Sequence, residues 1–210
     1  MTFLIKICGI TRPEDAATAC REGAGAIGVN LWRGSKRFVE DSQAREILSA
    51  VTPGVLKIGV VVNPHPLVVS ESLAGLGLDM VQFHGDEQPE TWSALPGKQV
   101  VRAIRVVDQH SMSAAIGWNP RYFLFDSFGD GYGGTGKLAP WQIIASSARR
   151  PFLLAGGLHP GNVAAAIRST HPDGVDVASG VESRTGIKDR DLVVAFIASA
   201  RAAARTFGQF

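Results

Sequence analysis

The chain has 210 residues, of which 45% are hydrophobic, and its formal net charge is +2. This is long enough for one domain with a full core, and residues 1–210 show no linker or change in composition that would divide them. The near-neutral charge and the lack of basic runs argue against nucleic acid as a partner.

Two cysteines lie twelve residues apart without a CxxC motif, which argues against a disulfide framework or a structural zinc site and suits a reducing cytoplasm. The chain enters its first apolar segment directly, and Lys6 interrupts that segment. This is not the pattern of a signal peptide, and no later segment is apolar enough to span a bilayer. We therefore expect a cytoplasmic protein.

Short apolar segments alternate with helical segments along the chain. The expected strands are residues 3–7, 26–30, 56–63, 80–84, 100–105, 122–126, 152–155 and 174–178. The expected helices are residues 13–22, 41–50, 66–74, 90–95, 109–116, 140–147, 162–169 and 189–205. Eight such units with short connections are typical of a parallel sheet and predict a single-domain α/β fold, the (β/α)8 or TIM barrel. An open doubly wound sheet is the alternative, but no GxGxxG motif opens the first helix.

The first strand ends in a turn that carries a thiol. Alternation along the strand puts Lys6 and Cys8 on one face and Ile5 and Ile7 on the other. Cys8 is then at the carboxyl tip of a strand, where barrels and open α/β sheets place their chemistry. The alternative is a small buried cysteine, the commoner fate of a free thiol.

A helix start follows the same turn. Thr11 can cap it, Glu14 stands three residues later as in a capping box, and Pro13 suits the first turn. Helical spacing turns Cys20 toward the core of the protein.

Polar residues stand at the carboxyl ends of the other expected strands, which share one mouth in a barrel. They are Asn30, Asn63, Gln82 with His84, Arg105 and Asp126. Asp126 ends a strongly apolar strand and either caps the next loop or acts as a proton donor whose pKa is raised by its apolar surroundings.

Glycines cluster in three of the loops that follow expected strands. Gly156-Gly157 and Ser179-Gly180 can present backbone N–H groups to a phosphate, although each pair also suits an ordinary tight turn. The glycine-rich residues 129–136, which include Gly133 and Gly134, suit a mobile lid.

Three charged groups near the expected mouth can act in different ways. Lys6 faces inward and would pair with Asp176 on the last strand, most simply as a buried ion pair. Arg37 either grips a carboxylate with two hydrogen bonds or is a solvated charge. His84, followed by Asp86 and Glu87, could suggest a metal, but no second histidine at ligand spacing supports one, so we expect no metal site.

In these motifs the chain resembles the phosphoribosylanthranilate isomerase family, which carries out the sugar isomerisation of tryptophan biosynthesis. The motifs occur in family order between residues 6 and 189. They are KICGIT at 6–11, SKRF at 35–38, QFHG at 82–85, Asp126 with GGTGK at 133–137, AGGL at 155–158, VDVASGVE at 175–182 and GIKD at 186–189.

The resemblance implies an Amadori rearrangement of N-(5-phosphoribosyl)anthranilate to 1-(2-carboxyphenylamino)-1-deoxyribulose 5-phosphate. It implies that Asp126 is the general acid and that Cys8 is the general base, in surroundings that favour its thiolate. Arg37 would bind the anthranilate carboxylate. Other substrate contacts would come from Gln82, His84, Gly133, Gly134 and Asp176, and the phosphate would be held by Gly156, Gly157, Ser179 and Gly180. No metal or organic cofactor is implied, and a monomer or a homodimer is expected.

Three other functions are open to such a barrel. Indole-glycerol-phosphate synthase uses a lysine and a glutamate, and a histidine-pathway isomerase uses a pair of aspartates, so the thiol and the single aspartate speak against both. A phosphate-binding barrel without catalysis, acting as a sensor or scaffold, is disfavoured because Cys8 and Asp126 are both present.

Overall fold

The computed structural model describes residues 3–93, 95–126 and 141–206. The expected lid, with Gly133 and Gly134, lies outside these residues, as does the expected start of a helix at residue 140.

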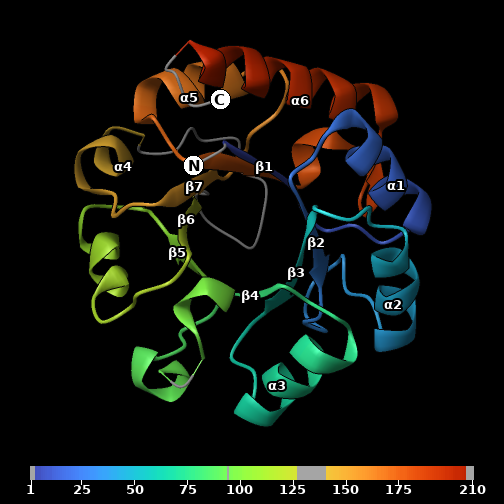
Figure 1. Cartoon of the computed structure of the whole chain (residues 1–210). Coiled ribbons are helices and arrows are strands. Elements are labelled where there is room, and N and C mark those ends of the chain that lie inside the picture. Colours follow the sequence, from blue (N-terminus) through green and yellow to red (C-terminus); the bar gives the residue numbers. More distant parts are fainter. Residues whose placement is uncertain (1–2, 94, 127–140, 207–210) are drawn as a thin grey trace.

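Eight parallel strands form a closed barrel in chain order (Figure 1). They are β1 Leu4–Ile7, β2 Ala26–Asn30, β3 Leu56–Val61, β4 Met80–Phe83, β5 Val100–Arg105, β6 Tyr122–Asp126, β7 Phe152–Ala155 and β8 Gly174–Val177. The barrel closes because β8 pairs with β1, with Lys6 opposite Asp176 in the register. The (β/α)8 prediction is therefore confirmed, and the open sheet was the wrong alternative.

Helices surround the barrel on the outside (Figure 1). They are α1 Pro13–Glu22, α2 Asp41–Ser49, α3 Pro66–Gly75, α4 Trp141–Ser147, α5 Val163–Thr170 and α6 Arg190–Arg205. The last helix, α6, packs beside both α1 and α5, so the two ends of the described chain meet on one side of the ring.

The helices expected at 90–95 and 109–116 are short 3-10 helices, namely η1 Pro89–Trp92 and η3 His110–Ala115, and a further one, η2 Gly97–Gln99, precedes β5. Such short segments can close i→i+3 hydrogen bonds but have little room for a regular α-helix. Trp92 of η1 still covers the barrel, with its ring centroid 4.4 Å from that of Phe83 in β4.

The predicted capping box at α1 is wrong. The N-cap residue is Arg12, which makes no side-chain cap hydrogen bond and instead pairs with Asp15. Thr11 Oγ1 donates to the carbonyl oxygen of Gly186, 175 residues later in the chain. The Thr11 hydroxyl therefore bonds to a distant segment instead of capping α1, as the local pattern predicted.

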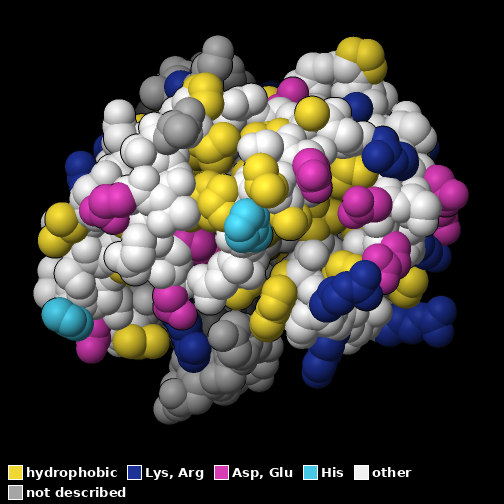
Figure 2. All heavy atoms as spheres, turned by 90° about the horizontal axis from the view of Figure 1, so that it is seen from below, with side chains coloured by type: hydrophobic (Ala, Val, Ile, Leu, Met, Phe, Trp, Pro, Cys, Tyr) yellow, Lys and Arg dark blue, Asp and Glu magenta, His cyan; other side chains and the backbone are white. Residues whose placement is uncertain are grey.

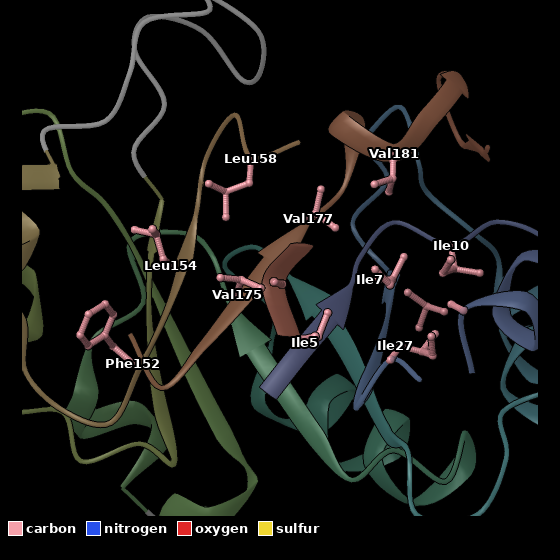
Figure 3. Packing of buried hydrophobic residues seen from close by; sticks show 14 of the residues in the cluster. Ile5, Ile7, Ile10, Ile27, Phe152, Leu154, Leu158, Val175, Val177 and Val181 are labelled. Atoms are coloured by element: carbon pink, nitrogen blue, oxygen red, sulfur yellow. The ribbon is translucent and has the colours of Figure 1, made fainter. Parts of the chain in front are cut away.

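Alternation along the strands separates two layers of core, as the sequence predicts. Leu4, Ile58, Leu124 and Leu153 pack inside the barrel. The opposite faces pack against the helices, including Ile5, Ile7, Val175 and Val177 (Figure 3). Each such fully buried side chain stabilises the fold by roughly 1.5–3 kcal/mol, so this register is strongly fixed.

The surface carries charges of both signs. Figure 2 shows basic, acidic and hydrophobic side chains intermixed on one face of the molecule. Among the described helices, none has the length and apolar character needed to cross a membrane.

Candidate active site at the carboxyl ends of the strands

Cys8 and Asp126 lie on the same rim of the barrel. Cys8 directly follows β1, and its amide donates to the carbonyl oxygen of Val177 in β8 at 2.8 Å. Asp126 is the last residue of β6. Because all eight strands are parallel and the barrel is closed, both residues lie at its carboxyl end.

A buried ion pair stands below Cys8. Lys6 Nζ lies 2.9 Å from Asp176 Oδ1, and the Lys6 side chain has no exposed surface. Burial lowers the pKa of Lys6, but Asp176 and Cys8 together outweigh that effect and the net pKa is raised. The pair predicted from the sequence is confirmed, and Lys6 carries its charge at neutral pH.

The surroundings of Cys8 do not favour its thiolate. Burial raises the pKa of the thiol, the charge of Lys6 within hydrogen-bonding reach opposes this, and the net pKa stays raised. Asp176 raises it further, because its charge offsets much of the field of Lys6. The expectation of a favoured thiolate is therefore wrong, because the raised pKa keeps the proton on the thiol near neutrality.

Gly28 in β2 makes room for this group. A Cβ at Gly28 would lie 2.8 Å from Cys8 Sγ and 3.2 Å from Lys6 Cε. The motifs of the sequence predicted no role for Gly28. The available signal was a glycine inside an otherwise apolar strand, which often marks a close approach.

We expect Gly28→Ala to displace Cys8 and Lys6, to lower stability by about 1–3 kcal/mol through overpacking, and to reduce turnover. Thermal unfolding and steady-state kinetics measure both effects. Gly75→Ala is the matched control, because a Cβ there makes only an ordinary 3.5 Å contact with Arg45. Wild-type turnover in Gly28→Ala would show that the site tolerates the displacement.

His84 stands beside Asp126, with Nε2 at 3.7 Å from Asp126 Oδ2. Gln82 Nε2 lies 3.1 Å from His84 Nδ1, so a Gln82 amide that donates there leaves the imidazole proton on Nε2, toward Asp126. Burial lowers the pKa of His84, and the negative charges of Asp126 and Asp176 oppose this without reversing it. The imidazole is therefore neutral near pH 7.

The loop after β4 is held by a second buried ion pair. Glu87 Oε2 lies 2.6 Å from Arg102 Nη1, and the Glu87 carboxylate also accepts from the amides of Asn63 and Gly85. These bonds fix the backbone directly after His84 and link it to Asn63, which follows β3. The described residues contain no cluster of three side chains that could hold a metal ion.

Arg37 reaches the mouth from the loop after β2. Its Nε and Nη2 donate to the two carboxylate oxygens of Glu182 at 2.7 and 2.6 Å. The Arg37 side chain crosses Gly9, which has a φ of +67° and where a Cβ would overlap Arg37 Cδ. Arg37 is therefore a fixed group rather than the solvated charge that was its alternative.

The two glycine loops lie against each other. Gly156 and Gly157 have φ values of +91° and +60°, which glycine adopts without strain. A Cβ at Gly180 would overlap the carbonyl oxygen of Leu158, so the loops after β7 and β8 are in direct contact. Ser179 opens the short helix η4, Ser179–Val181. The structure thus brings together all four residues predicted to hold a phosphate.

Glu182 and Lys188 lie in two of the family motifs but were not predicted to take part in the site. They belong to a hairpin that was not predicted, β9 Glu182–Arg184 with β10 Ile187–Lys188. Lys188 Nζ lies 2.9 Å from Glu182 Oε1. The one signal in the sequence that could have pointed to Glu182 and Lys188 is their position directly after the last barrel strand.

The protein is a closed (β/α)8 barrel whose carboxyl rim carries a thiol, carboxylates and glycine loops. These features define the class of barrel enzymes that act on small molecules at this rim. The sequence model described as N-(5'phosphoribosyl)anthranilate (PRA) isomerase matches residues 5–199. The chain belongs to this family of isomerases of tryptophan biosynthesis, as the motifs predict.

Named relatives agree with this. The N-(5'-phosphoribosyl)anthranilate isomerase of Nitrosomonas europaea is 42% identical over 212 residues, covering 96% of each chain. The phosphoribosyl anthranilate isomerase of Thermotoga maritima has a TM-score of 0.89 and 35% identity, over 96% of this chain and 100% of that one. A structure of such an isomerase in complex with reduced 1-(o-carboxyphenylamino)-1-deoxyribulose 5-phosphate has a TM-score of 0.84 and 34% identity, with the same coverage.

Proposed function

We propose that this chain rearranges N-(5-phosphoribosyl)anthranilate into 1-(2-carboxyphenylamino)-1-deoxyribulose 5-phosphate, with Asp126 as general acid and Cys8 as general base. The observation that carries the proposal is that β6 and β1 end at one rim, so that both groups stand at the mouth where barrel enzymes bind their substrates.

The chemistry assigns one proton transfer to each residue. Asp126 protonates the ring oxygen as the bond between that oxygen and C1 breaks, which leaves a cationic Schiff base. Cys8 then removes the proton from C2, and the electron pair of that C–H bond forms the C1–C2 double bond of an enolamine. Tautomerisation of the enolamine gives the ketose. The cationic Schiff base acidifies the C2 proton, so a thiol that is only partly deprotonated can serve as the base.

The other predicted contacts would bind and orient the substrate. We assign the phosphate to Gly156, Gly157, Ser179 and Gly180, whose loops adjoin. Hydroxyl groups of the sugar would meet Gln82, His84 and Asp176. Gln82 Oε1 is buried and has no hydrogen-bond partner among the residues described, which makes it a ready acceptor for a sugar hydroxyl. The family resemblance also assigns substrate contacts to Gly133 and Gly134.

We place the reaction in the cytoplasm, because Cys8 and Cys20 are both free thiols and the proposed base requires one of them reduced.

The proposed activity is tested by adding the protein to freshly made phosphoribosylanthranilate and following the loss of substrate fluorescence. We expect loss that scales with protein concentration and gives the ketose product. Heat-inactivated protein is the control for spontaneous hydrolysis of the substrate. Loss of fluorescence no faster than in that control would contradict the proposal.

We expect Arg37→Ala mainly to raise KM, by about 10-fold to 100-fold, because a charged hydrogen-bond partner of the substrate carboxylate is lost. Steady-state kinetics measures this. Arg33→Ala is the matched control, since Arg33 lies in the same loop but is exposed and paired with Glu40. An unchanged KM in Arg37→Ala would mean that its charge does not contact substrate.

A further inference from the structure

We infer that Glu182, supported by Lys188, is a positioning residue that sets the selectivity of the site for a substrate with an aromatic carboxylate. This inference rests on the proposed role of Arg37 and extends it to residues that do not contact the substrate themselves.

Glu182 occupies one edge of the Arg37 guanidinium and leaves the other available. Nε and Nη2 of Arg37 each donate a hydrogen bond to one oxygen of the Glu182 carboxylate. This two-point contact fixes the plane of the guanidinium. Nη1 makes no hydrogen bond to a residue that the structure describes, and the Arg37 side chain is 23% exposed. The edge formed by Nη1 and Nη2 can therefore receive a second carboxylate in the same geometry.

The position of the Arg37 guanidinium is also restricted by the backbone beneath its side chain. Its aliphatic stem crosses Gly9, next to Cys8, where a Cβ would overlap Arg37 Cδ. Its charge also favours the Cys8 thiolate, which places the guanidinium near the thiol.

Lys188 keeps Glu182 ionised and in place. Its Nζ lies 2.9 Å from Glu182 Oε1 and 3.0 Å from the carbonyl oxygen of Ala178, and its side chain is only 2% exposed. Burial raises the pKa of Glu182, but the hydrogen bonds and charges of Arg37 and Lys188 outweigh this and the net pKa is lowered. The hairpin pairing that sets Lys188 opposite Glu182 provides a rigid support for both.

Arg37 and Lys188 share the Glu182 carboxylate as a partner. Burial lowers the pKa of Lys188, and the Glu182 charge opposes this without reversing it. The hydrogen bonds to Glu182 raise the pKa of Arg37, so Arg37 keeps its charge and can attract a substrate carboxylate.

The test uses two stable ligands, reduced 1-(o-carboxyphenylamino)-1-deoxyribulose 5-phosphate and the same compound without the carboxylate. Their dissociation constants are measured by calorimetry for the wild type, Glu182→Gln, Arg37→Ala and the control Glu40→Gln. In Glu40→Gln, Arg33 loses its carboxylate partner in the same region, but that pair is exposed.

We expect the wild type to prefer the carboxylated ligand by about 10-fold or more, as for a hydrogen bond between charged groups. Glu182→Gln should lose most of that preference while binding the carboxylate-free ligand as the wild type does, and Glu40→Gln should keep the preference. Loss of affinity for both ligands alike, or an unchanged preference, in Glu182→Gln would overturn the inference.

Failure of the proposed function gives a different result. If Arg37→Ala keeps the full preference for the carboxylated ligand, the role of Arg37 itself is wrong, whatever Glu182→Gln does. Should Glu182→Gln fail to fold, Glu182→Asp replaces it, because it keeps the charge but is one methylene too short for the two-point contact. An unchanged preference in Glu182→Asp would also overturn the inference.

Discussion

Cys8→Ser should fold normally and lose turnover by on the order of 10²-fold or more, because a serine hydroxyl ionises far less readily than a thiol and so does not supply the anion that acts as the base. The substitution keeps the size of the group that packs against Gly28. Steady-state kinetics and a thermal melt measure the two properties. Cys20→Ser is the matched control, since Cys20 is the other buried free thiol and lies in α1, away from the mouth. Near-normal turnover in Cys8→Ser would remove Cys8 from the role of base.

The pH dependence of the wild type gives a second test of Cys8. Burial raises the pKa of the thiol above its ordinary value, so the thiolate is a minor form at neutral pH and becomes more abundant as the pH rises. We therefore expect the rate of Cys8 alkylation by iodoacetamide, followed by mass spectrometry, to rise with pH on the alkaline side of neutrality, approaching about tenfold per pH unit below that pKa. A profile that is flat between pH 7 and 9 would contradict a thiol base with a raised pKa.

Asp126→Asn should also lose turnover by on the order of 10²-fold or more, because an amide cannot deliver a proton to the ring oxygen. The residue keeps its shape at the end of β6, so a normal fold is expected. Asp108→Asn is the control, since Asp108 is an exposed carboxylate in the loop that follows β5.

Asp126→Asn also has an expected effect that is measured without enzyme activity, namely a change in the pKa of His84. Asp126 raises the pKa of His84 against the larger lowering caused by burial. Asp126→Asn should therefore lower the pKa of His84 still further, which an NMR titration of the imidazole measures. Turnover like that of the wild type would exclude Asp126 as the acid, and an unmoved His84 pKa would mean that the two groups do not interact.

Local sequence patterns predicted the strands well, because alternation alone separates the faces of a buried strand. Lys6 and Leu4 face the inside of the barrel and Ile5 and Ile7 face the helices, as expected. The patterns were less informative where partners come from distant segments. Thr11 bonds to Gly186 rather than capping α1, and no local pattern near Thr11 contains that information.

The protonation of Cys8 shows a similar limit. A lysine two residues before a cysteine on the same face suggests a thiolate, and Lys6 does lie within reach of the thiol. Asp176 pairs with the same lysine from β8, however, and the group is buried. The balance between desolvation and these two opposing charges depends on three-dimensional distances and cannot be obtained from spacing along the chain.

The sequence by itself determined the eight-unit barrel, the rim on which Cys8 and Asp126 lie, the Lys6–Asp176 pair and the family, since these follow from periodicity, strand order and motifs. Only the tertiary structure decided that Arg37 is held by Glu182 and Lys188, that Gly28 makes room for the thiol and that burial keeps Cys8 protonated. The physical reason is that charge pairing, close packing and desolvation depend on the distances between segments that only the closed barrel brings together.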